Sequence, residues 1–194
     1  MKKTLMIGSL LLFPLFSQAF AQETAKENLR IMSDAKDDTS YTVQVNGKPF
    51  EITRQMTSCA KNKGWLQPLI PVAGVHPITE IELLEGMNNA DFMLLDMRAQ
   101  DHFVEGTIPG AKNIPYTEVA MRLNELGCEK SANKWNCAKA KKVIAFCNGP
   151  VCPQSSIAIK ASVRDGFPAE NFYYYRGGML DWAALGFPIV EPDF

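Results

Sequence analysis

Two cysteines flank a tight turn in the stretch FCNGPVCPQSS, residues 146–156. Cys147 directly follows the apolar run VIAF, and Cys152 comes after four intervening residues. Free cysteines are usually buried and inert, but a cysteine at the junction of a strand and a helix is well placed to act as a nucleophile. Because Asn148-Gly149-Pro150 forces a turn, we expect both sulfur atoms to lie in one loop.

The expected site lies beyond the carboxyl end of a strand, where open α/β sheets bind their ligands. We expect Ser155 or Ser156 to cap the helix that follows. Backbone N–H groups of the loop and of the helix N-terminus should then form an anion-binding nest. A cysteine at its centre, Cys147, should have a lowered pKa and be present as a thiolate. The expected anion-binding loop comprises Asn148, Gly149, Pro150, Val151, Cys152, Pro153, Gln154 and Ser155.

The elements that must hold this loop alternate between two patterns from about residue 76. Strand-like apolar runs occupy residues 91–98, 141–147 and 171–178. Helical patterns occupy residues 79–87, 116–126, 155–166 and 179–186. Thr79 and Glu82 form a candidate capping box for the first helix. Strands that alternate with helices predict a parallel α/β sheet covered by helices on both faces.

The N-terminal residues 1–21 have the features of a secretory signal peptide. Lys2 and Lys3 precede the apolar run 5–16, and Ala19-Phe20-Ala21 fits a cleavage site, so we expect cleavage after Ala21. The alternative is an uncleaved membrane anchor, although the run is shorter than the roughly 20 residues that span a bilayer. We therefore expect a periplasmic protein with no membrane contact in its mature form.

Residues 22–75 are predicted to form an N-terminal extension to a main domain at 76–194. Residues 22–40 are polar, and two alternating runs around Asn46-Gly47 predict a β-hairpin over 41–52. Residues 64–78 are rich in proline and glycine and are expected to be an ordered linker, with the domain boundary near residue 75.

Charge and cysteine content restrict the function classes further. The net charge is −1, so nothing indicates a nucleic-acid partner. All five cysteines follow the signal peptide; Cys128 and Cys137 are the candidate disulfide, while Cys59 has no obvious partner. The two histidines, His76 and His102, are not in a metal-ligand spacing and are expected to be ordinary turn or surface residues.

Two further runs resemble the signatures of the rhodanese family. LLDMRAQDHFVEGTIPGAKNIPY (94–116) is similar to the first signature, and YRGGMLDWAALGFPIV (175–190) is similar to the closing one. The cysteine loop lies between them, as the family requires, and the resemblance covers roughly residues 76–192. It implies a rhodanese-like three-layer α/β/α domain with a central parallel sheet.

The resemblance also implies a sulfurtransferase. Cys147 would take sulfane sulfur from thiosulfate, a polysulfide or a persulfide, and pass it to a thiol or another nucleophile. Such a persulfide is a covalent intermediate that needs a thiolate and backbone donors, in agreement with the expected nest. No metal or organic cofactor is expected. The natural donor, the acceptor and the oligomeric state stay open.

Four other residues are expected to support the site or the core. Asp96 and Arg98 are expected to be structural, because in rhodanese-like domains these positions tie the strand end to neighbouring loops. Arg176 precedes Gly177-Gly178 and is either a substrate clamp or a surface arginine. Trp182 is expected in the core.

The loop departs from the family in two ways. It carries no arginine or lysine, which disfavours thiosulfate as the natural donor, and Pro153 stands where a related phosphatase would need its arginine. The second departure is Cys152, which either packs under the loop or is a resolving thiol. Two alternative functions follow: a thiol–disulfide redox protein that uses Cys147 and Cys152, or a non-catalytic binding module that uses residues 41–52 and 57–68.

Overall fold

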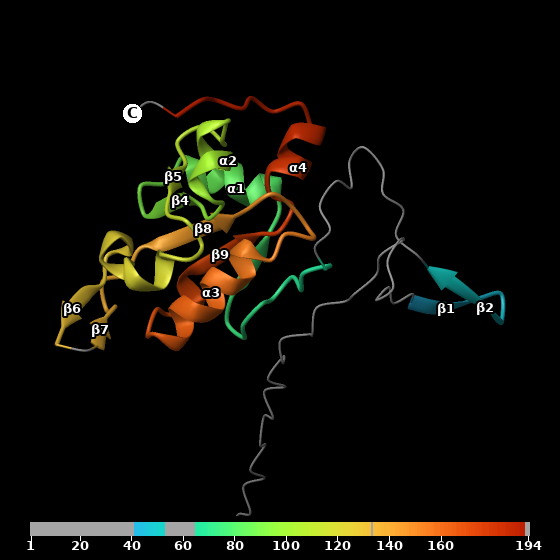
Figure 1. Ribbon diagram of the computed structural model, residues 1–194, viewed down its shortest axis with the longest axis horizontal. Coiled ribbons are helices and arrows are strands. Elements are labelled where there is room, and N and C mark those ends of the chain that lie inside the picture. The colour runs from blue at the N-terminus through green and yellow to red at the C-terminus, as the bar shows by residue number, and fades with distance from the viewer. Residues whose placement is uncertain (1–40, 53–64, 133, 193–194) are drawn as a thin grey trace, which may run out of the picture.

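The computed structural model describes residues 41–52, 65–132 and 134–192. Its centre is a five-stranded sheet in the order β3-β9-β8-β4-β5, and every neighbouring pair is parallel (Figure 1). The strands are β3 (His76–Ile78), β4 (Phe92–Asp96), β5 (Lys112–Asn113), β8 (Lys142–Phe146) and β9 (Phe172–Tyr175). Parallel strands of this kind are buried on both faces, which explains the apolar runs FMLLD, KVIAF and FYYY.

Helices cover both faces of the sheet. One face carries α3 (Gln154–Arg164) and the 3₁₀ helices η1 (Val119–Met121), η2 (Leu123–Leu126) and η3 (Ala169–Asn171). The other carries α1 (Glu80–Met87) and α4 (Gly178–Ala184), while α2 (Gln100–Val104) follows β4. The arrangement is a three-layer α/β/α fold, so the predicted fold class is confirmed.

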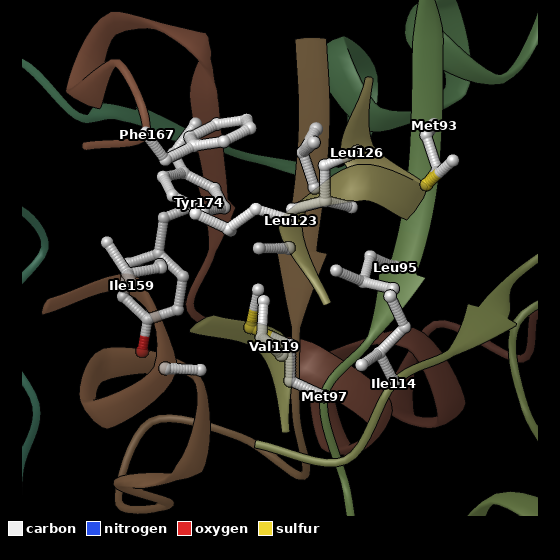
Figure 2. Close-up of a cluster of buried hydrophobic side chains, with 14 of the residues drawn as sticks. Met93, Leu95, Met97, Ile114, Val119, Leu123, Leu126, Ile159, Phe167 and Tyr174 are labelled. Carbon is white, nitrogen blue, oxygen red and sulfur yellow. The ribbon is translucent and has the colours of Figure 1, made fainter. Parts of the chain in front are cut away.

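Each face has its own apolar core. Figure 2 shows the first core, in which Leu95, Val119 and Ile159 converge between the sheet and the helices that cover it. In the second core, Trp182 is 2% exposed and packs with Phe146 and Leu83. The expectation that Trp182 belongs to the core agrees with this position.

Local sequence signals at the first helix are borne out, but the helix expected over 116–126 is wrong. At α1, Glu82 accepts hydrogen bonds from the backbone N–H and the hydroxyl of Thr79, at 2.9 and 2.7 Å.

Over 116–126 the chain does not form the expected helix but the two short turns η1 and η2. They are separated at Arg122, which has a non-helical backbone and pairs with glutamates on both sides. The apolar spacing marks the buried face correctly, but it does not determine which type of turn presents that face.

Two hairpins accompany the sheet. The predicted hairpin forms from β1 (Tyr41–Val45) and β2 (Lys48–Ile52), with positive φ angles at Asn46 and Gly47 as a tight turn requires. The second, β6 (Glu129–Ser131) with β7 (Lys134–Asn136), was not expected. The predicted disulfide between Cys128 and Cys137 is present and closes the base of this second hairpin.

The expected signal peptide, the polar lead-in 22–40 and Cys59 lie outside the described residues, and the domain boundary near residue 75 stays a prediction. The described segment 65–75 packs against the sheet domain: Val75 joins the first core, and Gln67 is 1% exposed. No helix in the described ranges is long and apolar enough to cross a membrane.

Candidate active site

The cysteine loop lies at the carboxyl end of β8, where Cys147 directly follows Phe146. The loop ends at Pro153, and α3 begins at Gln154. The predicted serine cap is therefore wrong, because Ser155 and Ser156 lie inside the first turn of α3 and are buried. A proline has a φ angle suited to a helix start and needs no N–H partner there, so the helix can begin directly after it.

The Gly177-Gly178 pair lets α4 approach the loop closely. The N–H of Met179 donates to the carbonyl oxygen of Cys147 at 3.0 Å, and the N–H of Leu180 donates to that of Asn148 at 2.9 Å. Gly178 has a φ of 57°, and a Cβ there would collide with the carbonyl oxygen of Cys147. The closing run of the sequence thus supports the backbone that carries Cys147.

A residue that the sequence analysis missed holds the opposite side of the loop. The N–H of Gln67 donates to the carbonyl oxygen of Pro150 at 2.8 Å. The carbonyl oxygen of Gln67 accepts from Nη1 of Arg176 at 3.0 Å. Gln67 therefore connects the loop with Arg176, the candidate substrate clamp. No motif marks Gln67, because both contacts use its backbone rather than its side chain.

Cys147 is 1% exposed, and its thiol donates to the carbonyl oxygen of Cys152 at 3.4 Å. Burial raises its pKa well above the ordinary value, and contact with Cys152 raises it further. The N–H and hydroxyl of Ser155 act in the opposite direction, but their effect is smaller. The expectation that Cys147 is itself the resting thiolate is therefore wrong, since removal from water outweighs the nest.

Of the two cysteines, Cys152 is the one that loses its proton first. Its pKa is lowered to about 6, above all because the Cys147 thiol donates a hydrogen bond to its sulfur. The backbone N–H groups of Gln154 and Asn148 add to this effect, while burial opposes it. Because the two thiols are in contact, they titrate as one unit that carries a single negative charge above that pH.

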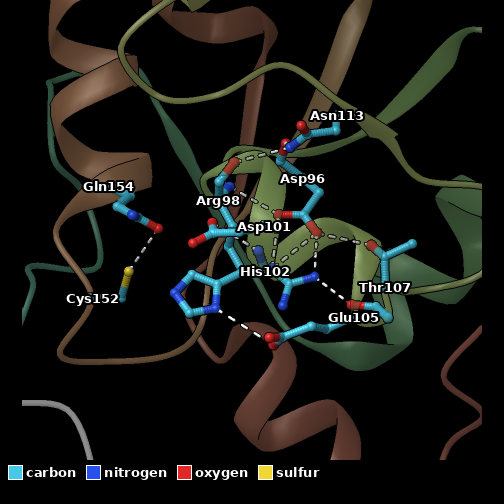
Figure 3. A network of polar contacts seen from close by, with 10 residues as sticks. Asp96, Arg98, Asp101, His102, Glu105, Thr107, Asn113, Cys152 and Gln154 are labelled. Carbon is cyan, nitrogen blue, oxygen red and sulfur yellow. Dashed lines mark hydrogen bonds and ion pairs between the residues drawn. The ribbon is translucent and has the colours of Figure 1, made fainter. Parts of the chain in front are cut away.

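The side chains around Cys152 come from two elements, as Figure 3 shows. When protonated, Cys152 donates to Oε1 of Gln154 at 3.5 Å. His102, on α2, was expected to be an ordinary surface residue; it is exposed, yet its charge also lowers the pKa of Cys152. Its Nδ1 lies 3.8 Å from a carboxylate oxygen of Glu105.

Asp96 and Arg98 form a buried ion pair at the end of β4, 2.6 Å apart. Arg98 also donates to the carbonyl oxygen of Gly106 at 2.6 Å, and the hydroxyl of Thr107 donates to Asp96 at 2.9 Å. Asn113 donates to the backbone oxygens of Asp96 and Arg98 (Figure 3). These bonds tie β4 to the following loop and to β5, so the pair acts on the framework of the site.

Metal ligation has no structural support in the described ranges, which contain no group of three or more His, Cys, Asp or Glu residues that could hold an ion. The chemically competent groups are two thiols, backbone N–H donors and nearby cations. This set suits nucleophilic sulfur chemistry, in which a thiolate attacks sulfur and nearby donors stabilise the charge.

A three-layer α/β/α fold with a cysteine loop after a central parallel strand defines the class of this protein. A sequence profile described as "Rhodanese-like domain" matches residues 79–185, more than half of the chain. The protein therefore belongs to the rhodanese-like domain family.

Several known proteins carry a similar domain. The chain is 31% identical over 114 residues to the HTH-type transcriptional regulator Rv0324 of Mycobacterium tuberculosis, which covers 59% of this chain and 44% of that protein. It is 30% identical over 108 residues to the mouse thiosulfate sulfurtransferase/rhodanese-like domain-containing protein 3, covering 54% of this chain and 66% of that protein. A sulfurtransferase of Allochromatium vinosum is 26% identical over 103 residues, covering 53% of this chain and 82% of that protein. The chain thus spans less than two thirds of the first two relatives.

Solved structures with a similar fold include a rhodanese-related protein from Thermoplasma volcanium, at 23% identity and a TM-score of 0.45, covering 60% of this chain and 99% of that one. The human single-domain sulfurtransferase TSTD1 is 21% identical with a TM-score of 0.43, covering 58% of this chain and 96% of that one.

Proposed function

We propose that this protein is a sulfurtransferase in which Cys147 accepts sulfane sulfur as a persulfide and passes it to a thiol or another nucleophile. Membership of the rhodanese-like family and the sulfurtransferase names of two relatives support the reaction class. The observation that carries the role of Cys147 is its position directly after β8, with the Ser155 N–H of α3 facing its sulfur.

The neighbouring thiol supplies a base that speeds the attack; when Cys152 is absent, water takes the proton of Cys147 more slowly. Cys152 carries the negative charge at neutral pH and accepts a hydrogen bond from the Cys147 thiol. Transfer of that proton to Cys152 makes Cys147 the thiolate, which attacks the sulfane sulfur of the donor. With a thiosulfate donor, the S–S bond breaks and sulfite leaves; with a polysulfide, a shortened polysulfide leaves. An acceptor thiolate then attacks the outer sulfur and regenerates Cys147.

The charge around the loop favours donors of low charge. Residues 148–153 contain no basic side chain. Arg176 stands beside the loop, but its Nη1 is already bonded to Gln67. A dianion such as thiosulfate gains most from cationic donors, so we propose an organic persulfide or a singly protonated polysulfide as the natural donor.

We propose that the protein works in the periplasm after export. The proposal rests on the signal-peptide pattern of residues 1–21. The Cys128–Cys137 disulfide supports it, because disulfides persist mainly in oxidising compartments outside the cytosol.

Transfer kinetics with Cys147→Ser test the proposed reaction. A polysulfide and thiosulfate serve as alternative donors, and a small thiol serves as the acceptor. We expect Cys147→Ser to abolish transfer from both donors, whereas a matched Cys128→Ser/Cys137→Ser variant should keep it. Full activity of folded Cys147→Ser would refute Cys147 as the sulfur carrier.

The contact between Cys147 and Cys152 favours one alternative, a thiol–disulfide redox protein. In that case Cys147 and Cys152 would undergo thiol–disulfide exchange with dithiols, and adding sulfane sulfur would not raise the rate. Cys147→Ser and Cys152→Ser would both be inactive in this exchange. A polysulfide or thiosulfate should then leave no persulfide on Cys147 in the Cys152→Ser variant.

A further inference from the structure

We infer that Cys152 is an internal acceptor that attacks the Cys147 persulfide and releases its sulfane sulfur as hydrosulfide. The inference rests on the proposed function, because it needs a persulfide on Cys147. It adds a second activity, the reduction of sulfane sulfur at the expense of a dithiol.

The loop holds the two sulfur atoms together. The Cys147 thiol lies 3.4 Å from the carbonyl oxygen of Cys152, and when Cys152 is ionised the single proton of Cys147 is shared with the Cys152 sulfur instead. The N–H of Cys152 donates to the carbonyl oxygen of Gly149 at 2.9 Å, which closes the turn that carries Cys152. Cys152 is therefore an acceptor thiol already in place when a persulfide forms.

The position of Cys152 in the same loop favours it as the first acceptor. Cys147 is 1% exposed and Cys152 is 6% exposed. The N–H groups of Met179 and Gln67 bind the carbonyl oxygens of Cys147 and Pro150, which fixes the start and the middle of the loop. An external acceptor attacks the outer sulfur, whereas Cys152 lies in the same loop as the inner sulfur of Cys147 and needs no approach from solvent.

The surroundings of Cys152 suit a nucleophile that must change its protonation state. The N–H groups of Gln154 and Asn148 and the charge of His102 stabilise its thiolate. The side-chain amide of Gln154 lies 3.5 Å from the sulfur. An amide has both an acceptor and donors. Its oxygen accepts a hydrogen bond from the Cys152 thiol, and after a rotation its NH₂ group donates one to the Cys152 thiolate.

The reaction balances without any further reagent. The Cys152 thiolate attacks Sγ of Cys147, the inner sulfur of the persulfide. The new Cys147–Cys152 S–S bond forms, the bond to the outer sulfur breaks, and the outer sulfur leaves as HS⁻. The sulfane sulfur gains two electrons, and the two cysteine sulfurs are oxidised to the disulfide. An external dithiol then reduces this disulfide by thiol–disulfide exchange and becomes a disulfide itself.

A single-turnover experiment tests the inference in the protein cleaved after Ala21, with Cys59→Ser present throughout to remove the remaining thiol. The protein, with Cys147 and Cys152 reduced, receives one equivalent of polysulfide and no added thiol. Released sulfide is measured, and intact mass with peptide mapping assigns the state of each cysteine. The same is done with Cys152→Ser, and circular dichroism verifies that this variant is folded.

We expect one sulfide per protein and a Cys147–Cys152 disulfide when Cys152 is present. In Cys152→Ser we expect a stable persulfide on Cys147, which forms more slowly because the neighbouring base is missing. A dithiol should then make sulfide release catalytic only when Cys152 is present. If both proteins keep the persulfide and release no sulfide, the inference is overturned while the proposed function stands. If neither protein gains sulfur at Cys147, the proposed function itself fails.

Discussion

Nη1 of Arg176 donates to the backbone oxygen of Gln67 at 3.0 Å, and the N–H of the same Gln67 donates to the backbone oxygen of Pro150 at 2.8 Å. A cation after β9, the segment before β3 and the cysteine loop are therefore joined through one residue. The contact fixes a positive charge beside a loop that has none of its own. Arg176 is thus the side chain whose positive charge should interact most strongly with a negatively charged sulfur donor.

Replacing Arg176 should penalise charged donors most. For Arg176→Met we expect kcat/KM with thiosulfate to fall roughly ten- to hundredfold, since a hydrogen bond to a charged group contributes about 1.5–3 kcal/mol. The loss with a singly charged organic persulfide should be smaller, and Arg176→Lys should recover part of the thiosulfate rate. The exposed Arg164, paired with Asp165, provides the matched control Arg164→Met. Equal losses with both donors would show that Arg176 acts only on the framework.

Gly178 should tolerate no side chain. Gly178→Ala places a methyl group against the carbonyl oxygen of Cys147 at a φ of 57°. Gly186 also has a positive φ, but a methyl group added there would meet nothing within 4 Å, so Gly186→Ala isolates the backbone penalty of about 1–2 kcal/mol. We expect Gly178→Ala to lower the free energy of unfolding by at least about 1–3 kcal/mol more than Gly186→Ala. Equal effects in urea denaturation would contradict the close approach.

The buried ion pair should matter for stability. Asp96 is fully buried and Arg98 is 5% exposed, so Asp96→Ala leaves a buried cation without its partner. We expect a loss of about 3–5 kcal/mol in the free energy of unfolding, partly recovered in Asp96→Ala/Arg98→Met. The exposed pair of Arg122 with Glu118 serves as the control, because Glu118→Gln should cost about 1 kcal/mol or less. If Asp96→Ala lowered the free energy of unfolding no more than Glu118→Gln does, the structural role of the buried ion pair would be refuted.

The shared charge of the two cysteines predicts a pH dependence. Thiolate forms as the pH rises through the pKa, so the ultraviolet absorbance of thiolate should rise with a midpoint near pH 6. Sulfur uptake should rise over the same range. Cys147→Ala removes the main hydrogen-bond donor to Cys152 and should move the midpoint up, whereas Cys147→Ser keeps a hydroxyl donor and should move it less. These titrations need Cys59→Ser, and an unchanged midpoint in Cys147→Ala would contradict the coupling.

Local patterns in the sequence predicted much of the fold. The apolar runs became the three central strands, Asn46-Gly47 became a hairpin turn, and Thr79 with Glu82 became a capping box. Each of these signals acts within a few residues or repeats with the period of its element, so it can be recognised without knowledge of the tertiary structure.

The failures depend on contacts between distant segments. Burial of Cys147 under α3 and α4 reverses the expected shift of its pKa, and the amount of burial depends on how the layers pack. Gln67 acts through its backbone at a distance of more than 80 residues along the chain from Pro150, so no side-chain pattern marks it. The serine cap was misplaced because Pro153 starts the helix earlier than either serine.

Peptide mapping by mass spectrometry tests the central claim most directly. The Cys152→Ser protein is incubated with one equivalent of polysulfide, digested without reductant, and the mass of every cysteine peptide is measured. We predict the added mass of one sulfur atom on the peptide that contains Cys147 and on no other. Sulfur on another cysteine, or none on Cys147 in folded protein, would contradict Cys147 as the sulfur carrier.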